Sequence, residues 1–196
     1  EMLLNLNPCF VLELTATPHE NSNIISYVDA MALHSEQMIK LPLMVSQQNS
    51  QSDVMMAALT LRHNLEALAL AEQTKGGAYI RPIILFQAEP KSKEDTTTFE
   101  KVKAQLLDIG IPENQIAIKT SEINELKNVD LLSPDCEVRF VITVNALKEG
   151  WDCPFAYILA NLANKSSVVD VTQIVGRVLR QPYARWHNKK LLNSSF

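Results

Sequence analysis

The chain has 196 residues, a mass of 22.0 kDa and a net charge of −4, with 46% hydrophobic and 20% charged residues. These values are typical of a soluble globular chain with one full core or two small lobes, and they exclude a third domain. The sequence contains neither a run of about 18 apolar residues nor a basic segment followed by an apolar stretch at its start, so we expect a cytoplasmic protein without a membrane span or secretion signal. Three cysteines without CxxC spacing predict reduced thiols rather than disulfides or a zinc site.

The charge is unevenly distributed along the chain. Residues 171–196 contain five basic side chains and no acidic one, which leaves −9 for residues 1–170. A basic segment of this kind favours a phosphate-bearing partner, although a solvated basic face explains the same pattern. Because the first residues already enter a strand-like run and the last follow a basic stretch, we expect a fragment of a larger protein.

The first half of the chain alternates between strand-like and helix-like segments. The apolar run Cys9–Thr17 ends at a proline and predicts a buried strand. Residues 24–39 are rich in helix formers, and Leu41–Val45 favours a strand. Apolar residues at helical spacing then predict a helix that starts at Asp53 and stops at the glycine pair Gly76–Gly77.

The second half repeats the alternation. The expected strands are Ile83–Gln87, Gln115–Lys119, Val138–Val144 and Phe155–Leu162. The expected helices are Glu94–Asp108, Glu122–Lys127 and Val168–Gln181. Strands that alternate with helices predict βαβ units, so we expect an α/β fold built on a parallel sheet.

The last predicted helix has a polar face opposite an apolar one. At about 100° per residue, Gln173, Arg177 and Arg180 fall on one side and three valines on the other. Two planar guanidinium groups one turn apart can converge on one polyanion, and pairing of both arginines with surface carboxylates is the structural alternative. Gly176 costs this helix about 1 kcal/mol relative to alanine, so we expect a backbone or a ligand to approach it closely.

Two other polar stretches directly follow predicted strands, and ligand sites in open parallel sheets lie beyond the carboxyl ends of the strands. In Lys148–Pro154, Gly150 permits a tight turn, and Asp152 can accept from a ribose hydroxyl or orient an arginine. Thr15 and Thr17 offer two hydroxyls at the turn that ends the first predicted strand, which is a weak signal by itself.

Four segments resemble, in this order, motifs III, IV, V and VI of superfamily 2 helicases: Thr15–Pro18, Ile83–Gln87, Asn145–Pro154 and Gln173–Arg180. The stretches ALKEGWDCPFAYILANL and VVDVTQIVGRVLRQP are most similar to the helicase (Res) subunit of type III restriction enzymes. The resemblance covers nearly the whole chain and is weakest from Asn21 to Lys75. It implies a RecA-like parallel β-sheet flanked by helices, in the three-layer α/β/α arrangement of P-loop NTPases.

The resemblance also implies a division of the chain. Residues 1–20 match the last strand and motif III of a first RecA-like lobe, and residues 21–52 form a connecting segment. Residues 53–196 match the second, helicase C-terminal lobe, truncated at its C-terminus. On the same resemblance, Arg177 and Arg180 reach the γ-phosphate of ATP between the two lobes and stabilise charge in the transition state.

The remaining motif residues take supporting roles by the same resemblance. Those expected to bind or couple to ATP are Gln173, Gly176, Gly150, Asp152, Thr15 and Thr17. Thr143 and Asn145 are the expected nucleic-acid contacts. Many members of the superfamily place a threonine six residues before the motif V glycine, where this chain has Val144 and a threonine one position earlier.

The function implied by the resemblance is the ATP-dependent DNA helicase or translocase motor of a type III restriction endonuclease. The sequence contains neither a GxxxxGK[ST] loop nor a DExH motif, so ATP and Mg²⁺ would be bound mainly by the missing first lobe, and we expect this chain alone to be inactive. The expected partners are double-stranded DNA and the methylation (Mod) subunit. The alternatives are the second lobe of a type I restriction motor or RNA helicase, or a non-catalytic nucleic-acid-binding module.

Overall fold

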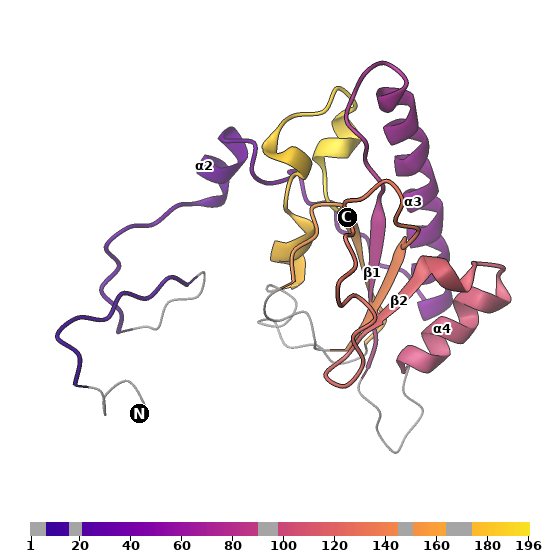
Figure 1. The fold of residues 1–196 in the computed structure, drawn as a ribbon, viewed down its shortest axis with the longest axis horizontal. Helices are drawn as coiled ribbons and strands as arrows, with labels where there is room; N and C mark the ends of the chain where they lie inside the picture. The colour runs from indigo at the N-terminus through magenta and orange to yellow at the C-terminus, as the bar shows by residue number, and fades with distance from the viewer. Residues whose placement is uncertain (1–6, 16–20, 90–97, 145–150, 164–173) are drawn as a thin grey trace.

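A four-stranded parallel sheet forms the centre of the chain (Figure 1). The computed structural model describes residues 7–15, 21–89, 98–144, 151–163 and 174–196. The strands are β1 (Ile83–Gln87), β2 (Ile116–Lys119), β3 (Phe140–Thr143) and β4 (Ala156–Asn161), in the order β2-β3-β1-β4. All three strand pairs are parallel. The predicted α/β fold is therefore confirmed, and the arrangement is consistent with a RecA-like lobe.

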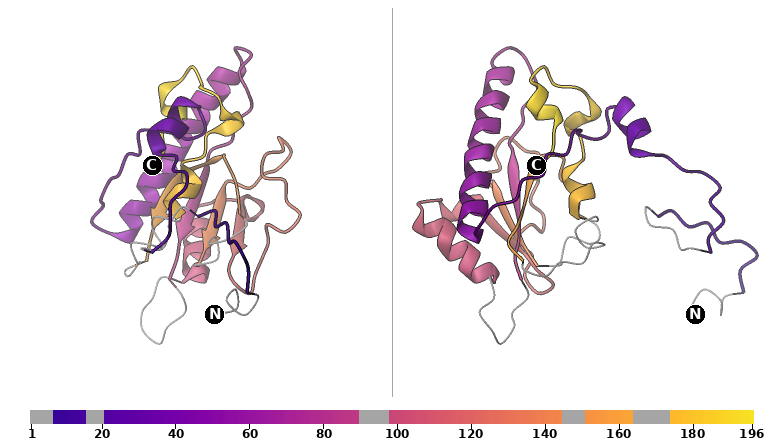
Figure 2. Two further views of the ribbon diagram at one scale, coloured as in Figure 1. Left: turned by 90° about the vertical axis from the view of Figure 1, so that its left-hand side faces the viewer. Right: turned by 180° about the vertical axis from the view of Figure 1, so that it is seen from behind.

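Helices flank the sheet on both sides (Figures 1 and 2). One side is covered by α3 (Gln51–Gln73) and α4 (Phe99–Asp108). Residues 174–178, which are helical, lie on the other side with the C-terminal segment that follows them. Every residue of β1 is buried, as a continuous apolar run between two layers requires. None of the helices in the described ranges combines the length and apolarity that a membrane crossing needs.

The long helix α3 has clear start and stop signals. The Ser50 hydroxyl accepts the backbone N–H of Asp53 at 3.1 Å, so the helix begins two residues before its predicted start. At its other end Gly76 has a φ of +84°, the left-handed conformation that glycine adopts most easily. The buried side of this helix consists of Met55, Ala58, Leu65, Ala69 and Glu72.

The predicted N-terminal strand Cys9–Thr17 is wrong over its described part. Residues 9–15 have no regular structure and are exposed, and Leu14 is 91% exposed. Figure 1 shows this segment extending away from the sheet. A strand needs a neighbour to satisfy its backbone groups, and the described part of the chain offers this segment none. The apolar pattern of residues 9–15 thus builds no strand within the described ranges.

Three further predictions differ from the structure. Of the helix expected in 24–39, only α2 (Ala30–Ser35) is helical, and 41–45 forms a single isolated bridge at Leu43 rather than a strand. The helix expected over 122–127 is a turn, because the Thr120 hydroxyl accepts the backbone N–H groups of residues 122 and 123 and competes with helix formation. The other described boundaries agree with the predicted ones to within a few residues.

Lys40 joins the connecting segment to the body of the lobe. Its side chain is completely buried, and its Nζ donates hydrogen bonds to the carbonyls of Pro154 (3.0 Å), Ala156 (2.8 Å) and Arg180 (2.7 Å). The ammonium also lies 4.0 Å from the centre of the Tyr157 ring. Burial lowers the pKa of Lys40 well below its ordinary value. The second half of the connecting segment is thus part of the folded lobe.

Candidate functional site

The two motif segments with the strongest resemblance meet in the structure. Arg180 forms an ion pair with Asp152, with 2.6 Å between Nη1 and Oδ2. One turn earlier, Arg177 donates from Nη1 to the carbonyl of Trp151. Residues 174–178 together with Arg180, which we call the arginine segment, therefore lie against the short segment that leads into β4. Asp152 thus contacts an arginine, which is one of the two kinds of contact that the sequence suggested for it.

The ion pair is accessible to solvent. The side chains of Arg180 and Asp152 are 53% and 51% exposed. Burial, followed by repulsion from the neighbouring Arg180, lowers the pKa of Arg177, and the carboxylate of Asp152 acts in the opposite direction. A phosphate oxygen could take the place of the carboxylate on Arg180 without unfolding any element, because both ligands accept the same charge-assisted hydrogen bonds.

Lys40 holds together the two segments that carry this pair. It donates to the carbonyl of Arg180 on one side and to that of Pro154, two residues after Asp152, on the other. The main chain adds a second link, because the N–H of Gln181 donates to the carbonyl of Met38 at 2.9 Å. No sequence motif indicates Lys40. Its three partners are backbone carbonyls, which every residue type has, so the contacts leave no trace in the amino-acid sequence.

The remaining ATP-site predictions are only partly described. Gly176 is exposed, and a Cβ built on it would meet no described atom within 4 Å, so no backbone in the described ranges explains the glycine. Thr15 is exposed in the N-terminal segment, which Figure 1 shows apart from the arginine segment. Predicted site residues outside the described ranges are Gln173, Gly150, Thr17 and Asn145.

Two buried polar groups lie at the carboxyl ends of adjacent strands. Gln87 ends β1 and Thr143 ends β3, and the two residues are paired in register. The Gln87 Oε1 and Thr143 Oγ1 atoms are buried and have no hydrogen-bond partner in the part of the chain that the structure describes. Thr143 is completely buried, so its hydroxyl is not presented to a nucleic-acid phosphate in this structure. Sequence reasoning did not single out Gln87, although its place at the end of a buried strand was the available signal.

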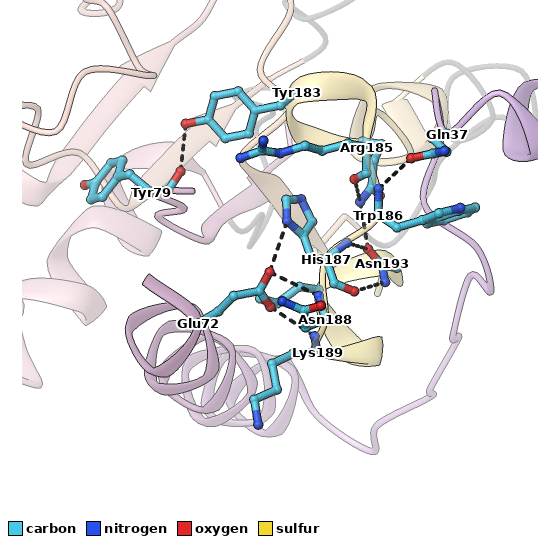
Figure 3. A network of polar contacts seen from close by, with 12 residues as sticks. Gln37, Glu72, Tyr79, Tyr183, Arg185, Trp186, His187, Asn188, Lys189 and Asn193 are labelled. Atoms are coloured by element: carbon cyan, nitrogen blue, oxygen red, sulfur yellow. Dashed lines mark hydrogen bonds and ion pairs between the residues drawn. The ribbon is translucent and has the colours of Figure 1, made fainter. Parts of the chain in front are cut away.

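A second polar cluster attaches the C-terminal segment to the end of α3 (Figure 3). The buried carboxylate of Glu72 accepts the backbone N–H groups of Asn188 (3.1 Å) and Lys189 (3.0 Å). Its Oε1 also lies 3.5 Å from Nδ1 of His187. Burial lowers the pKa of His187, and the nearby Glu72 only partly offsets this. The cluster fixes the segment that immediately follows the arginine segment.

The described part of the site supplies cations for a phosphate but no complete nucleotide or metal site. Within the described ranges, no three histidine, cysteine or acidic side chains are grouped to hold a metal ion. The sequence has no glycine-rich loop of the P-loop type to surround the phosphates. The arrangement fits one half of a shared phosphate site, in which two arginines approach a ligand that is held from elsewhere.

No protein-family model matches the chain, and no curated protein or solved structure matches it.

Proposed function

We propose that this chain is the second motor lobe of an ATP-driven DNA translocase of the type III restriction kind. In this proposal Arg177 and Arg180 are supplied to a nucleotide that the first lobe holds. The observation that carries it is the contact of both arginines with residues 151–152, because it brings the motif V-like and motif VI-like segments together on an accessible surface.

The residues of this chain would stabilise negative charge in the transition state and would form no covalent bond to the substrate. ATP with Mg²⁺, bound mainly by the first lobe, would supply the phosphoryl group. Arg177 and Arg180 would stabilise the negative charge that develops on it, an effect worth about 10³–10⁵ in rate for an arginine supplied to a phosphate site. Asp152 would hold Arg180 in place until the lobes close, and Lys40 would keep the two segments aligned.

The exposed N-terminal segment fits the same proposal. Its apolar side chains have no sheet to pack against among the described residues, and the last strand of a first lobe would find that sheet in the first lobe itself. The motor would translocate along double-stranded DNA, and the methylation (Mod) subunit would provide target recognition. Both partners follow from the resemblance alone, whereas the proposed cytoplasmic location follows from the sequence pattern.

The proposal is tested on the full-length protein by DNA-stimulated ATP hydrolysis. The variants Arg177→Ala and Arg180→Ala should each lower kcat by at least about 10³-fold, while DNA binding without nucleotide stays unchanged. Lys75→Ala is the matched control, because it removes one exposed positive charge at the far end of α3. Unchanged hydrolysis in both arginine variants would rule the assignment out.

The basic C-terminal segment supports one second candidate, a non-catalytic nucleic-acid-binding module. Arg185 and Lys190 are exposed in a stretch without acidic residues. A module of this kind would bind DNA with an affinity that falls steeply with salt, about tenfold or more between 50 and 200 mM for a few phosphate contacts. The module is favoured if the full-length protein binds DNA in this way but the two motif VI-like arginines have no effect on ATP hydrolysis. The same ATPase assay distinguishes other superfamily 2 motors by their preference for DNA or RNA.

A further inference from the structure

An apolar groove of about 640 Å³ runs along the outer edge of β4. Its walls come from α3, from β4, from the arginine segment and from residues 43–48. Among the lining side chains, Val45 is 86% exposed and Ala57 is also exposed. Apolar walls on several sides of one channel are unusual on a surface that faces only water.

The main chain at one end of this groove is already paired as a parallel strand. The N–H of Phe196 donates to the carbonyl of Tyr157 at 2.9 Å, and the N–H of Leu159 donates to the carbonyl of Phe196 at 2.7 Å. This alternation is that of a parallel ladder. On its other side, Ser195 forms two backbone hydrogen bonds of 3.1 and 2.8 Å with residues 42–44. Ser195 and Phe196 thus lie between β4 and residues 42–44 as the beginning of a fifth parallel strand.

We propose that the groove is the slot for the rest of this fifth strand, and that the residues following Phe196 in the full-length protein fill it. A parallel strand advances by about 3.3 Å per residue. The second residue after Phe196 would therefore pair with Leu159 and Asn161 of β4. Because the slot is apolar on both faces, the segment should be a short, nearly continuous apolar run. This inference rests on the expectation that the chain is part of a longer protein, and not on the proposed ATP chemistry.

Continuity with the existing pairing favours this occupant over a second copy of the chain. The groove begins where the backbone of Phe196 already lies in register, so a covalently attached segment is present at a high effective concentration. A second copy would have to enter the same slot and lose its translational and rotational freedom. An attached segment does not lose this translational and rotational freedom.

The fifth strand would also support the arginine segment. Val175 and Val178 form part of the groove wall and lie on the apolar side of the helix that carries Arg177. A strand packed against these valines would fix the helix on the side opposite its arginines. The groove therefore lies beside the proposed ATP site. The fifth-strand proposal and the ATP-site proposal can nevertheless be disproved separately.

The test compares three chains: residues 1–196, the same chain extended by about ten residues encoded next in its gene, and a chain extended by a Gly-Ser sequence of equal length. The native extension should raise Tm by at least about 4 °C. It should also slow hydrogen exchange at the Asn161 amide by about tenfold or more. The Gly-Ser extension should do neither. Equal effects of the two extensions, or no effect of the native one, would overturn the proposal.

Two substitutions and a mass measurement sharpen the test. A proline at the second added position removes the N–H that would donate to Leu159 and should abolish the gain in Tm. Val45→Asp should reduce the gain, whereas Val129→Asp, at an exposed valine outside the groove, should not. In the full-length protein the same proline should lower Tm. A dimer of the 196-residue chain that persists after extension would show that a second copy occupies the slot, and would overturn the proposal.

Discussion

Lys40 and Arg180 are joined by a hydrogen bond of 2.7 Å between the ammonium of the former and the backbone carbonyl of the latter. The two residues are 140 positions apart in the chain. Through the same ammonium, the carbonyls of Pro154 and Ala156 are held beside the end of the arginine segment. One buried cation therefore organises three segments that sequence reasoning treated separately.

Lys40→Met should destabilise the chain by about 2–4 kcal/mol. The substitution keeps most of the unbranched side chain but leaves three carbonyl oxygens without their buried donor. Methionine also avoids the cost of burying a charge, and this gain compensates only in part. For a chain of this size the change corresponds to a fall in Tm of roughly 5–15 °C. Thermal unfolding monitored by circular dichroism measures it, with the exposed Lys75→Met as the control. Equal Tm values for the two variants would contradict a structural role for Lys40.

Asp152→Asn should change stability by less than about 1 kcal/mol, because its ion pair with Arg180 is half exposed and such pairs contribute little. In the full-length protein the same change should lower ATP hydrolysis, since Arg180 would lose the group that orients it. Thermal unfolding and steady-state kinetics on one preparation separate the two effects. A large loss of Tm with unchanged kinetics would show that the pair is structural instead.

Gly176→Ala and Gly77→Ala should have opposite effects on stability. An added Cβ at Gly176 meets no described atom, so alanine should stabilise the helix by up to about 1 kcal/mol. At Gly77 the Cβ would lie 2.6 Å from Cγ of Glu72 and 2.8 Å from the Glu72 carbonyl oxygen, so alanine should be destabilising. Urea unfolding of both variants compares the signs. If Gly176→Ala also lowers ATP hydrolysis in the full-length protein, the glycine serves a ligand that approaches from outside this chain.

His187 should make the chain less stable in mild acid. Burial lowers its pKa below the ordinary value of 6.5, so between these two values the unfolded chain binds a proton that the folded chain does not. Stability should therefore fall as pH drops through about 6.5 towards the lowered pKa. The charged or titratable groups around the ring are Glu72 and Arg185. The loss of Tm between about pH 7.5 and 5.5 should be smaller in His187→Gln, and parallel curves would contradict the assignment.

The central sheet was predictable because each of its strands is encoded locally. Ile83–Gln87 was predicted with its observed bounds, since five apolar or weakly polar residues between turn signals are typical of a strand buried on both faces. The start of α3 was missed by two residues because Ser50, rather than Ser52, provides the cap. The contact of Asp152 with Arg180 was also predictable, because each residue belongs to one of the two segments that resemble helicase motifs.

The failures at residues 9–15, Lys40 and Glu72 share one physical cause, which is dependence on distant partners. Residues 9–15 have the composition of a buried strand but lack a neighbouring strand among the described residues. Lys40 and Glu72 look like surface residues in the sequence, and both are buried because distant backbone groups satisfy their charges. Backbone partners are identical for every residue type, so the sequence pattern carries no sign of them.

The position of Ser195 has a consequence for how the chain is made. It pairs through its backbone with residues 42–44, which leave the ribosome long before it does. During synthesis those early residues must wait without their partner, beside an open edge of β4. The sheet core can form as its strands emerge, but the pairing of residues 42–44 is postponed until Ser195 has been synthesised. Translational pausing before Ser195 would leave the early segment open to proteases, and cleavage there would detach Lys40 from the arginines it supports.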